Sequence, residues 1–151
     1  MGNLMLESLS KHYGSAVAVE RVDLDVRQGE MVALLGPSGC GKTTTLRMVA
    51  GFVVPTGGRV LIGGTDVTQA PPHARDTGMV FQSYALFPHM TVGANIAFGL
   101  EMRRVGRAES EQRVREVLRL VRLEGLEDRL PRQLSGGQQQ RVALSRALVV
   151  N

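Results

Sequence analysis

The residues of this chain with the clearest chemistry form a glycine-rich loop, Gly-Pro-Ser-Gly-Cys-Gly-Lys-Thr, over residues 36–43. The loop matches the phosphate-binding pattern G-x-x-x-x-G-K-[ST]. Its glycines let successive backbone N–H groups turn toward one centre, where no side chain blocks a phosphate. Lys42 can reach the terminal phosphates of a nucleotide, and the Thr43 hydroxyl can bind Mg2+. The loop therefore predicts a nucleoside triphosphate site; the alternative is a glycine-rich turn that matches by chance.

The segments on either side of the loop occur in the order that such a site requires. Met31–Leu35 is an unbroken apolar run, which predicts a buried parallel strand. Thr44–Ala50 predicts a helix, and Gly51 is placed to end it. The start of that helix adds unpaired N–H groups and the positive end of the helix dipole. Strand, loop and helix together favour phosphate binding.

A second motif, Leu-Ser-Gly-Gly-Gln, covers residues 134–138. Ser135 and Gln138 have the spacing of a capping box, so the motif could simply begin a helix. Two glycines in the first helical turn argue against that explanation, because each costs about 1 kcal/mol of helix propensity relative to alanine. A ligand that must approach the backbone closely would explain the glycines, and a second phosphate-binding helix start is one such case.

The rest of the chain predicts a β-rich first part followed by helices. Strands are expected over Leu4–Tyr13, Val17–Val26, Arg59–Ile62 and Gly78–Phe81, with turns at Gly14-Ser15 and at the paired glycines around residue 60. From Thr91 onward the apolar spacing is helical, and Gly106 separates two helices. The apolar faces are expected at Val92, Ile96 and Leu100, at Val114, Val117, Leu118 and Val121, and at Leu144, Ala147 and Leu148.

Composition is that of a globular chain, with 43% hydrophobic and 21% charged residues. The net charge of +4 raises the question of nucleic-acid binding. Arginines between residues 101 and 132 are interleaved with acids, however, and Glu109–Arg113 and Glu111–Arg115 have the i,i+4 spacing of a solvated helix face. Aromatic residues make up only 4%, so stacking platforms are scarce. These features predict no nucleic-acid partner.

The two glycine motifs together resemble the nucleotide-binding domain of an ABC transporter, and the resemblance runs along essentially the whole chain. Phe81–Tyr84 is similar to the family's Q-loop, and Tyr13 to the aromatic residue that stacks on adenine. Tyr84–Val92 is similar to importer ATPases for polyamines, ferric iron or sugars, with polyamines as the first hypothesis. The implied fold is α/β: a P-loop NTPase core with an antiparallel β part and a helical subdomain. The expected division is 1–30 for the β part, 31–88 for the core, 89–135 for the helical subdomain and 136–151 for the signature helix.

The resemblance also implies roles for individual residues. Lys42 and Gln82 would be catalytic, and Thr43 and Gln82 would bind Mg2+. The ATP contacts would be Tyr13, Gly36, Pro37, Ser38, Gly39, Cys40, Gly41, Lys42, Thr43 and Thr44, with Ser135, Gly136, Gly137 and Gln138 contacting the ATP held by a second subunit. Structural alternatives remain: Tyr13 could pack at a strand end, Gln82 could hydrogen-bond within its loop, and Cys40 could be only a small loop residue.

The implied activity is that of an ATPase subunit that couples ATP hydrolysis to solute import. Such a subunit would lie at the cytoplasmic face of the membrane and pair head to tail with a second nucleotide-binding subunit. Its permease partners would bind near Tyr84–Pro88, and a solute-binding protein would act indirectly. The alternative for Tyr84–Pro88 is an apolar loop that ends in proline.

In this family a hydrophobic strand ending in Asp-Glu follows the signature helix, and the 151 residues contain no such segment. We therefore expect the chain to be the first part of a longer protein and to lack hydrolysis by itself, and we expect unpaired apolar surface on the isolated fragment. One alternative is a nucleotide-binding fragment or degenerate subunit that binds ATP without hydrolysing it. Another is a soluble ABC ATPase acting on DNA or ribosomes, against which the importer-like Phe87–Met90 and the balanced charges argue.

Overall fold

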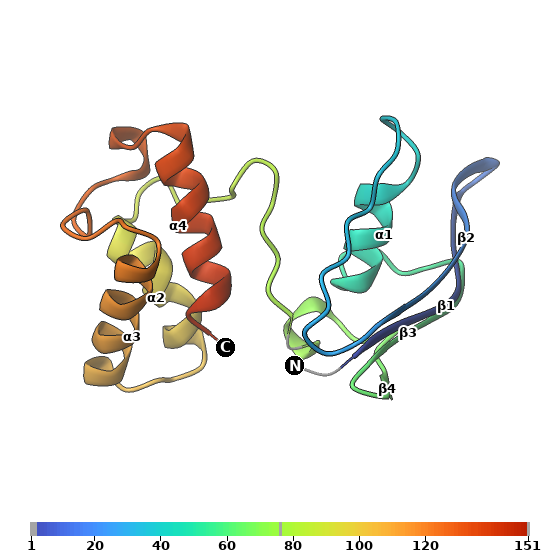
Figure 1. Cartoon of the computed structure of the whole chain (residues 1–151), viewed down its shortest axis with the longest axis horizontal. Helices are drawn as coiled ribbons and strands as arrows, with labels where there is room; N and C mark the ends of the chain where they lie inside the picture. Colours follow the sequence, from blue (N-terminus) through green and yellow to red (C-terminus); the bar gives the residue numbers. More distant parts are fainter. Residues whose placement is uncertain (1–2, 76, 151) are drawn as a thin grey trace. The chain divides into compact units, whose positions relative to one another are not determined.

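The computed structural model describes residues 3–75 and 77–150; residues 1, 2, 76 and 151 lie outside the described part. The chain divides into two compact units, the first unit over residues 1–77 and the second unit over residues 78–151. They run from blue to green and from yellow-green to red in Figure 1. Each unit has a hydrophobic core of its own. In the described ranges no helix has both the length and the apolar character needed to cross a membrane.

The first unit is built on a four-stranded antiparallel sheet covered by one helix (Figure 1). The strand order is β2 (Ala16–Val26), β1 (Leu4–Tyr13), β3 (Gly57–Ile62) and β4 (Thr65–Asp66). Helix α1 (Lys42–Val49) contributes Met48 to a core that also holds Leu6, Leu9, Val19, Val60 and Val67. A short 3-10 helix, η1 (Pro72–Ala74), follows β4. The three strands predicted in this unit are confirmed, within two residues at each end.

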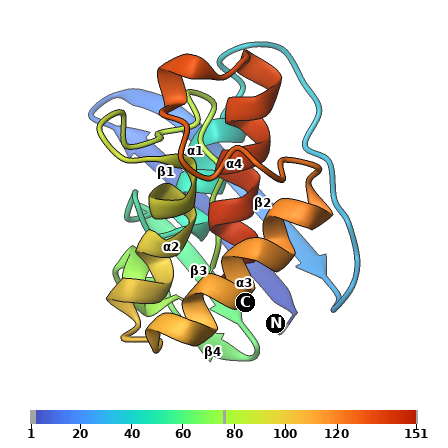
Figure 2. The same cartoon turned by 90° about the vertical axis from the view of Figure 1, so that its left-hand side faces the viewer.

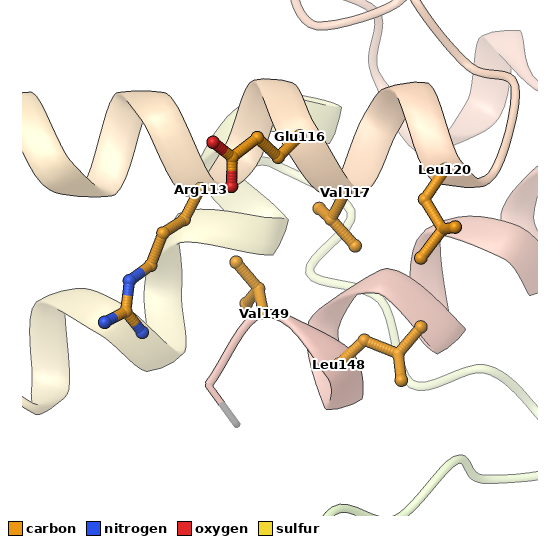
Figure 3. A pocket seen from close by; sticks show the side chains of 6 residues that line it. All are labelled: Arg113, Glu116, Val117, Leu120, Leu148 and Val149. Atoms are coloured by element: carbon orange, nitrogen blue, oxygen red, sulfur yellow. The ribbon is translucent and has the colours of Figure 1, made fainter.

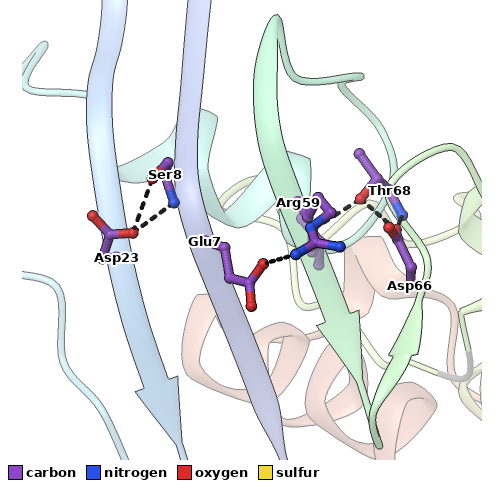
Figure 4. A network of polar contacts seen from close by, with 7 residues as sticks. Glu7, Ser8, Asp23, Arg59, Asp66 and Thr68 are labelled. Atoms are coloured by element: carbon purple, nitrogen blue, oxygen red, sulfur yellow. Dashed lines mark hydrogen bonds and ion pairs between the residues drawn. The ribbon is translucent and has the colours of Figure 1, made fainter.

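A bulge in β1 explains how Leu6 and Leu9, which regular alternation would place on opposite faces of the strand, reach the same core. The pairing of β1 with β2 shifts between Leu6 and Leu9, and Ser8 has a φ of 49°. The extra residue of a bulge reverses the alternation of side chains, so Leu6 and Leu9 are both buried. Ser8 N–H, which the bulge turns out of the ladder, donates to Asp23 Oδ1 of β2 at 2.6 Å (Figure 4).

In its described residues, the second unit has three α-helices packed around one apolar core (Figure 2). Helix α2 (Val92–Met102) contacts both α3 (Arg107–Leu120) and α4 (Gly136–Leu148), and a 3-10 helix, η2 (Pro131–Gln133), precedes α4. The predicted separation of α2 from α3 is confirmed, with Gly106 as the N-cap of α3. The predicted faces of α2 and α3 are also buried: Val92, Ile96, Leu100, Val114, Val117, Leu118 and Val121.

Two predicted core strands are wrong. Neither Met31–Leu35 nor Gly78–Phe81 forms a strand. Met31 is 95% and Leu35 90% exposed, and Val80 is 41% exposed. An apolar run becomes a buried parallel strand only where neighbouring strands accept its hydrogen bonds and helices cover both faces. Within the described residues the sheet is antiparallel and contains neither segment, so these runs have no such neighbours.

The predicted face of α4 is also wrong at its two leucines. Val142, Ala143 and Ser145 are the buried residues of this helix, whereas Leu144 is 43% and Leu148 40% exposed. Leu148 instead lines an open pocket of about 600 Å3 with side chains of α3 (Figure 3). The smaller side chains face inward because they allow α4 to pack closely on its neighbours, and a spacing rule based on the largest apolar residues misses them.

The surface of α3 carries ion pairs, but one partner differs from the prediction. Arg113 pairs with Glu109 at 2.7 Å, as predicted. Glu111 pairs with Arg107 at 2.9 Å rather than with Arg115. The hydrogen bond from Arg107 lowers the pKa of Glu111. Both pairs are solvent-exposed, so they support a solvated helix face and add little stability.

Candidate nucleotide-binding site

The glycine-rich loop ends tightly against β2 in the first unit. Gly41 has a φ of 90°, in the region that glycine adopts without strain. A Cβ atom at this position would lie 2.5 Å from the carbonyl oxygen of Ala18 and 2.9 Å from a methyl group of Val19. Only glycine fits here. The sheet therefore fixes the point at which the loop becomes helix α1.

The start of α1 presents backbone donors and no competing side chain. Gly41 is the N-cap, and no side chain caps the helix. The N–H groups of Lys42, Thr43 and Thr44 have no acceptor within the helix, since its first carbonyl acceptor is that of Gly41, which bonds Thr45 N–H at 2.8 Å. Anions bind readily at a helix start of this kind.

Lys42 folds back across the loop. Its Nζ atom donates to the carbonyl oxygens of Gly36 at 2.8 Å and Pro37 at 2.6 Å, and it lies 3.3 Å from Cys40 Sγ. Cys40 is the single cysteine and is exposed. The ammonium group is thus at the centre of the curl formed by the residues predicted to bind phosphate. Ser38 and Gly39, between Pro37 and Cys40, are exposed as well.

Tyr13 lies in the same unit, at the end of β1. Its side chain is 54% exposed, and its partner in β2 is Ala16, two residues before the Ala18 carbonyl that Gly41 approaches. Lys11 Nζ lies 5.0 Å from the centre of the Tyr13 ring and donates to the Val54 carbonyl at 2.7 Å. An exposed ring held by a cation on one side leaves a face that can stack.

The second glycine motif begins α4 in the second unit and contains the predicted capping box. Ser135 Oγ accepts from Gln138 N–H at 3.3 Å, and Gln138 Oε1 accepts from Ser135 N–H at 2.8 Å. Neither Gly136 nor Gly137 has a positive φ, and a Cβ atom on either would meet no atom within 4 Å. Among the described residues of the second unit, neither backbone angle nor packing therefore requires glycine at these two positions.

Gln82 also belongs to the second unit. It is exposed in a turn closed by a hydrogen bond from Tyr84 N–H to the Phe81 carbonyl at 2.9 Å. The predicted site residues thus fall into two groups. The first unit contains Tyr13 and residues 36–44, and the second unit contains Gln82 and residues 135–138.

The residues available for Mg2+ are oxygen donors without a carboxylate cluster. The described residues contain no group of three or more His, Cys, Asp and Glu side chains suited to a metal. Thr43, at the first turn of α1, is exposed. Because Mg2+ keeps several waters and is held by few protein ligands together with substrate phosphates, a hydroxyl beside a phosphate loop fits this ion when it arrives with a nucleotide.

Three buried or half-buried polar side chains that donate to backbone carbonyls were missed by the sequence analysis. Arg75 is 3% exposed in the first unit, and Asn95 is fully buried in the second unit. Arg146 is half-buried in α4. Burial lowers the pKa of both arginines. A polar residue on an otherwise apolar helix face was the one available signal, and it applied to Asn95, which lies beside Ile96.

Comparison with known proteins gives a consistent result. The model of the ABC transporter family matches residues 19–151. The spermidine/putrescine import ATP-binding protein PotA of Thermobifida fusca is 61% identical over 97% of this chain and 39% of its own length. The iron import ATP-binding protein FbpC 1 of Haemophilus influenzae is 56% identical over 97% of this chain and 45% of its own length.

The sulfate/thiosulfate import ATP-binding protein CysA of Thermosynechococcus vestitus is 58% identical over 97% of this chain and 44% of its own length. The chain thus spans less than half the length of these curated relatives. A solved dimer of the ATP-binding cassette MJ0796, bound to ADP and Pi, aligns with a TM-score of 0.85 and 34% identity, covering 98% of this chain and 70% of that one. The α/β fold predicted from the sequence is confirmed, and the chain belongs to the ABC transporter family.

Proposed function

We propose that the complete protein containing this chain is the ATP-binding subunit of an importer. The phosphate loop would hold the triphosphate, with Lys42 at the terminal phosphates, and Tyr13 would stack on adenine. Thr43 and Gln82 would hold Mg2+, which when bound neutralises phosphate charge. The support is a loop that ends in unpaired backbone donors, with Lys42 folded back across it and Thr43 in the first turn of the helix.

The observation that carries the proposal is the pair of glycines at the start of α4. Gly136 and Gly137 lower helix propensity relative to alanine, and among the described residues of the second unit neither backbone angle nor packing requires them. A ligand from outside the chain that approaches the backbone explains this cost. We therefore propose that Ser135, Gly136, Gly137 and Gln138 contact the γ-phosphate of ATP held by a second copy of the subunit.

In this arrangement ATP would hold two subunits together. Two helix starts on opposite sides of one triphosphate each present N–H groups and the positive end of a dipole. ATP would hold the head-to-tail pair closed, and loss of the γ-phosphate would release it. Gln82 would orient the attacking water from its exposed turn. The proposed chemistry is phosphoryl transfer to water, in which positioning and charge stabilisation supply most of the catalysis.

Hydrolysis is proposed for the complete protein and not for these 151 residues. In this family such carboxylates come from an apolar strand ending in Asp-Glu, a segment that the 151 residues do not contain. We propose that the chain by itself binds ATP without turnover. Its exposed apolar segment at Met31 and Leu35 supports the expectation of unpaired surface on the fragment.

The solute and the partners are proposed from the relatives. Polyamines are the first candidate, because four of the matched relatives, 56–61% identical, are named for spermidine and putrescine import. A permease would bind near Tyr84–Pro88, and the subunit would lie at the cytoplasmic face of the membrane. A solute-binding protein would act through that permease.

The experiment compares two glycines near helix starts, of which only Gly137 has a proposed ligand. Gly137→Ala and Gly106→Ala both place a methyl group where no described atom of the second unit lies within 4 Å. Gly137 lies in the first turn of α4, and Gly106 is the N-cap of α3. Dimerisation of the complete protein would be measured by light scattering with the Mg2+ complex of a non-hydrolysable ATP analogue. We expect dimerisation to weaken at least about tenfold for Gly137→Ala, which corresponds to about 1.4 kcal/mol, and to be unchanged for Gly106→Ala.

Lys42→Ala serves as the negative control, because it should abolish binding of a fluorescent ATP analogue. Equal dimerisation of the Gly137→Ala and Gly106→Ala proteins would overturn the proposed role of the second motif. Retained nucleotide binding by Lys42→Ala would overturn the role of the phosphate loop.

A further inference from the structure

Arg146, in the last turn of α4, makes its polar contacts with the loop over residues 84–88. Its Nη1 atom donates to the Ala85 carbonyl at 2.6 Å, and its guanidinium carbon lies 4.8 Å from the centre of the Phe87 ring. None of the ion pairs in residues 3–75 and 77–150 involves Arg146. A half-buried guanidinium without a carboxylate partner is costly to desolvate. The contacts of Arg146 with the loop offset this cost.

The backbone of this loop is strained at two successive residues. Tyr84 and Ala85 have φ angles of 63° and 48°, the left-handed region that residues other than glycine rarely adopt. Two successive residues of this kind persist only when surrounding groups fix them. The carbonyl that Arg146 binds belongs to the second of these residues, so the hydrogen bond acts directly on the strained segment.

The other end of the loop is fastened separately. Asn95 of α2 accepts from Phe87 N–H at 2.9 Å and donates to the carbonyls of Phe87, Met90 and Thr91 at 3.0 to 3.1 Å. The Phe87 ring also packs on Phe98 of α2, with ring centres 4.6 Å apart. The loop thus has one anchor on α2 and another, Arg146, on α4.

We propose that Arg146 is a positioning residue that transmits the state of the Ser135 end of α4 to the loop over residues 84–88. The helix between Gly136 and Arg146 is continuous and about 15 Å long. A nucleotide that binds at the start of α4 would therefore change or fix the position of the Ala85 carbonyl through Arg146. The transmission rests on the proposed function, whereas the fastening of the loop by Arg146 does not.

Arg141 offers a matched control on the same helix. Its Nη1 atom donates to the carbonyls of Val121 at 2.9 Å and Arg122 at 3.3 Å, at the end of α3. Arg122 also has a left-handed φ, of 56°. Arg141 therefore makes the same kind of contact from α4, but to the helical core rather than to the loop.

Hydrogen–deuterium exchange on the complete protein tests the proposal, with peptides covering residues 81–91, 119–123 and 135–140. The samples are wild type, Arg146→Gln, Arg146→Lys and Arg141→Gln, each with and without Mg2+ and the non-hydrolysable ATP analogue. In wild type we expect nucleotide to slow exchange at residues 135–140 and at residues 81–91. Without nucleotide, Arg146→Gln should speed exchange of residues 81–91 about tenfold, and nucleotide should no longer slow it. Arg146→Lys, which keeps a donor but not the planar group, should be intermediate.

The control separates this role from a general loss of stability. Arg141→Gln should speed exchange at residues 119–123 and leave the nucleotide response of residues 81–91 intact. The proposal is overturned if Arg146→Gln keeps that response, or if it loosens residues 119–123 as much as the loop. If wild type shows no slowing at residues 135–140, the proposed function fails and the transmission fails with it. The comparison without nucleotide then still decides whether Arg146 fastens the loop.

Discussion

Gly51 leaves free the space that the Arg75 guanidinium occupies: a Cβ atom on Gly51 would lie 2.5 Å from Arg75 Nε. Arg75 is 3% exposed and donates to the carbonyls of Met48 at 2.7 Å, Thr68 at 2.9 Å and Ala70 at 2.8 Å. The last carbonyls of α1, the helix that begins at the phosphate loop, are thus satisfied by a side chain from later in the chain. This contact ties the helix to the segment that follows β4.

Gly51→Ala should therefore destabilise the first unit more than a left-handed backbone alone explains. Gly51 has a φ of 81°, and Gly64 has a nearly equal φ of 79°, but a Cβ atom on Gly64 would meet no atom within 4 Å. We expect Gly64→Ala to cost about 1 kcal/mol of unfolding free energy, and Gly51→Ala about 3 kcal/mol, because displacing Arg75 leaves buried carbonyls unpaired. Urea denaturation followed by circular dichroism measures both, and equal losses would contradict the role of Arg75.

Alkylation of Cys40 should block nucleotide binding, and bound ATP should protect the thiol. The Sγ atom is exposed and 3.3 Å from Lys42 Nζ, so an adduct would fill the curl of the loop. Modification by iodoacetamide, followed by mass spectrometry, would be compared with binding of a fluorescent ATP analogue. Cys40→Ser, treated in the same way, controls for modification elsewhere. Unchanged binding by fully alkylated protein would refute the prediction.

Local rules predicted much of the fold because the groups that satisfy them lie close in sequence. The capping box of Ser135 and Gln138 needs only a spacing of three residues, and Gly51 ends α1 by its own backbone angle. Met31–Leu35 failed for the opposite reason: whether an apolar run is a strand depends on partners far away in sequence. Apolar spacing also misled at Leu144, since closeness of helix packing decides which side chains face inward.

The candidate site divides in the same way. Lys42 and Thr43 are fixed by one loop and one helix start, so a motif predicts them. Arg75, Asn95 and Arg146 act on backbone carbonyls, which leave no trace in the sequence at the accepting end. Nothing in the residue types distinguishes Arg146 from the solvated arginines of α3, because only the folded position of Ala85 gives it an acceptor.

The hydrogen bond from Ser8 N–H to Asp23 should make the first unit sensitive to acid. That bond, followed by the one from Arg21, lowers the pKa of Asp23 below its ordinary value. Ionised Asp23 therefore stabilises the fold above about pH 4, and this contribution is lost as the pH falls through the lower, folded-state pKa. We expect the melting temperature to fall between pH 5 and pH 3 less steeply for Asp23→Asn than for wild type.

Asp25 provides the control for this pH dependence. It lies on the same strand, and no hydrogen bond to its carboxylate is found among residues 3–75 and 77–150. Asp25→Asn should therefore leave the acid profile of wild type unchanged. An identical slope for the Asp23→Asn and Asp25→Asn proteins would show that the Ser8 contact contributes nothing to acid stability.

Asn95→Asp should destabilise the second unit strongly, with a pH dependence opposite to that of Asp23. Asn95 is fully buried, and its amide donates to three carbonyl oxygens. A carboxylate at this position has no hydrogen to donate to those carbonyl oxygens, so we expect a loss of about 3 kcal/mol or more of unfolding free energy at pH 7. Burial would raise the folded-state pKa of the new acid, so its protonated form is the stable one and stability falls as the pH rises above about 4. The difference in unfolding free energy between Asn95→Asp and wild type, measured by urea denaturation, should therefore be smaller at pH 4.5 than at pH 7. Asn95→Ala removes the same hydrogen bonds without adding a charge, so its loss of unfolding free energy should not change with pH. A loss for Asn95→Asp that also stays constant with pH would contradict the burial of the new carboxylate and would mean that the loop rearranges to admit water.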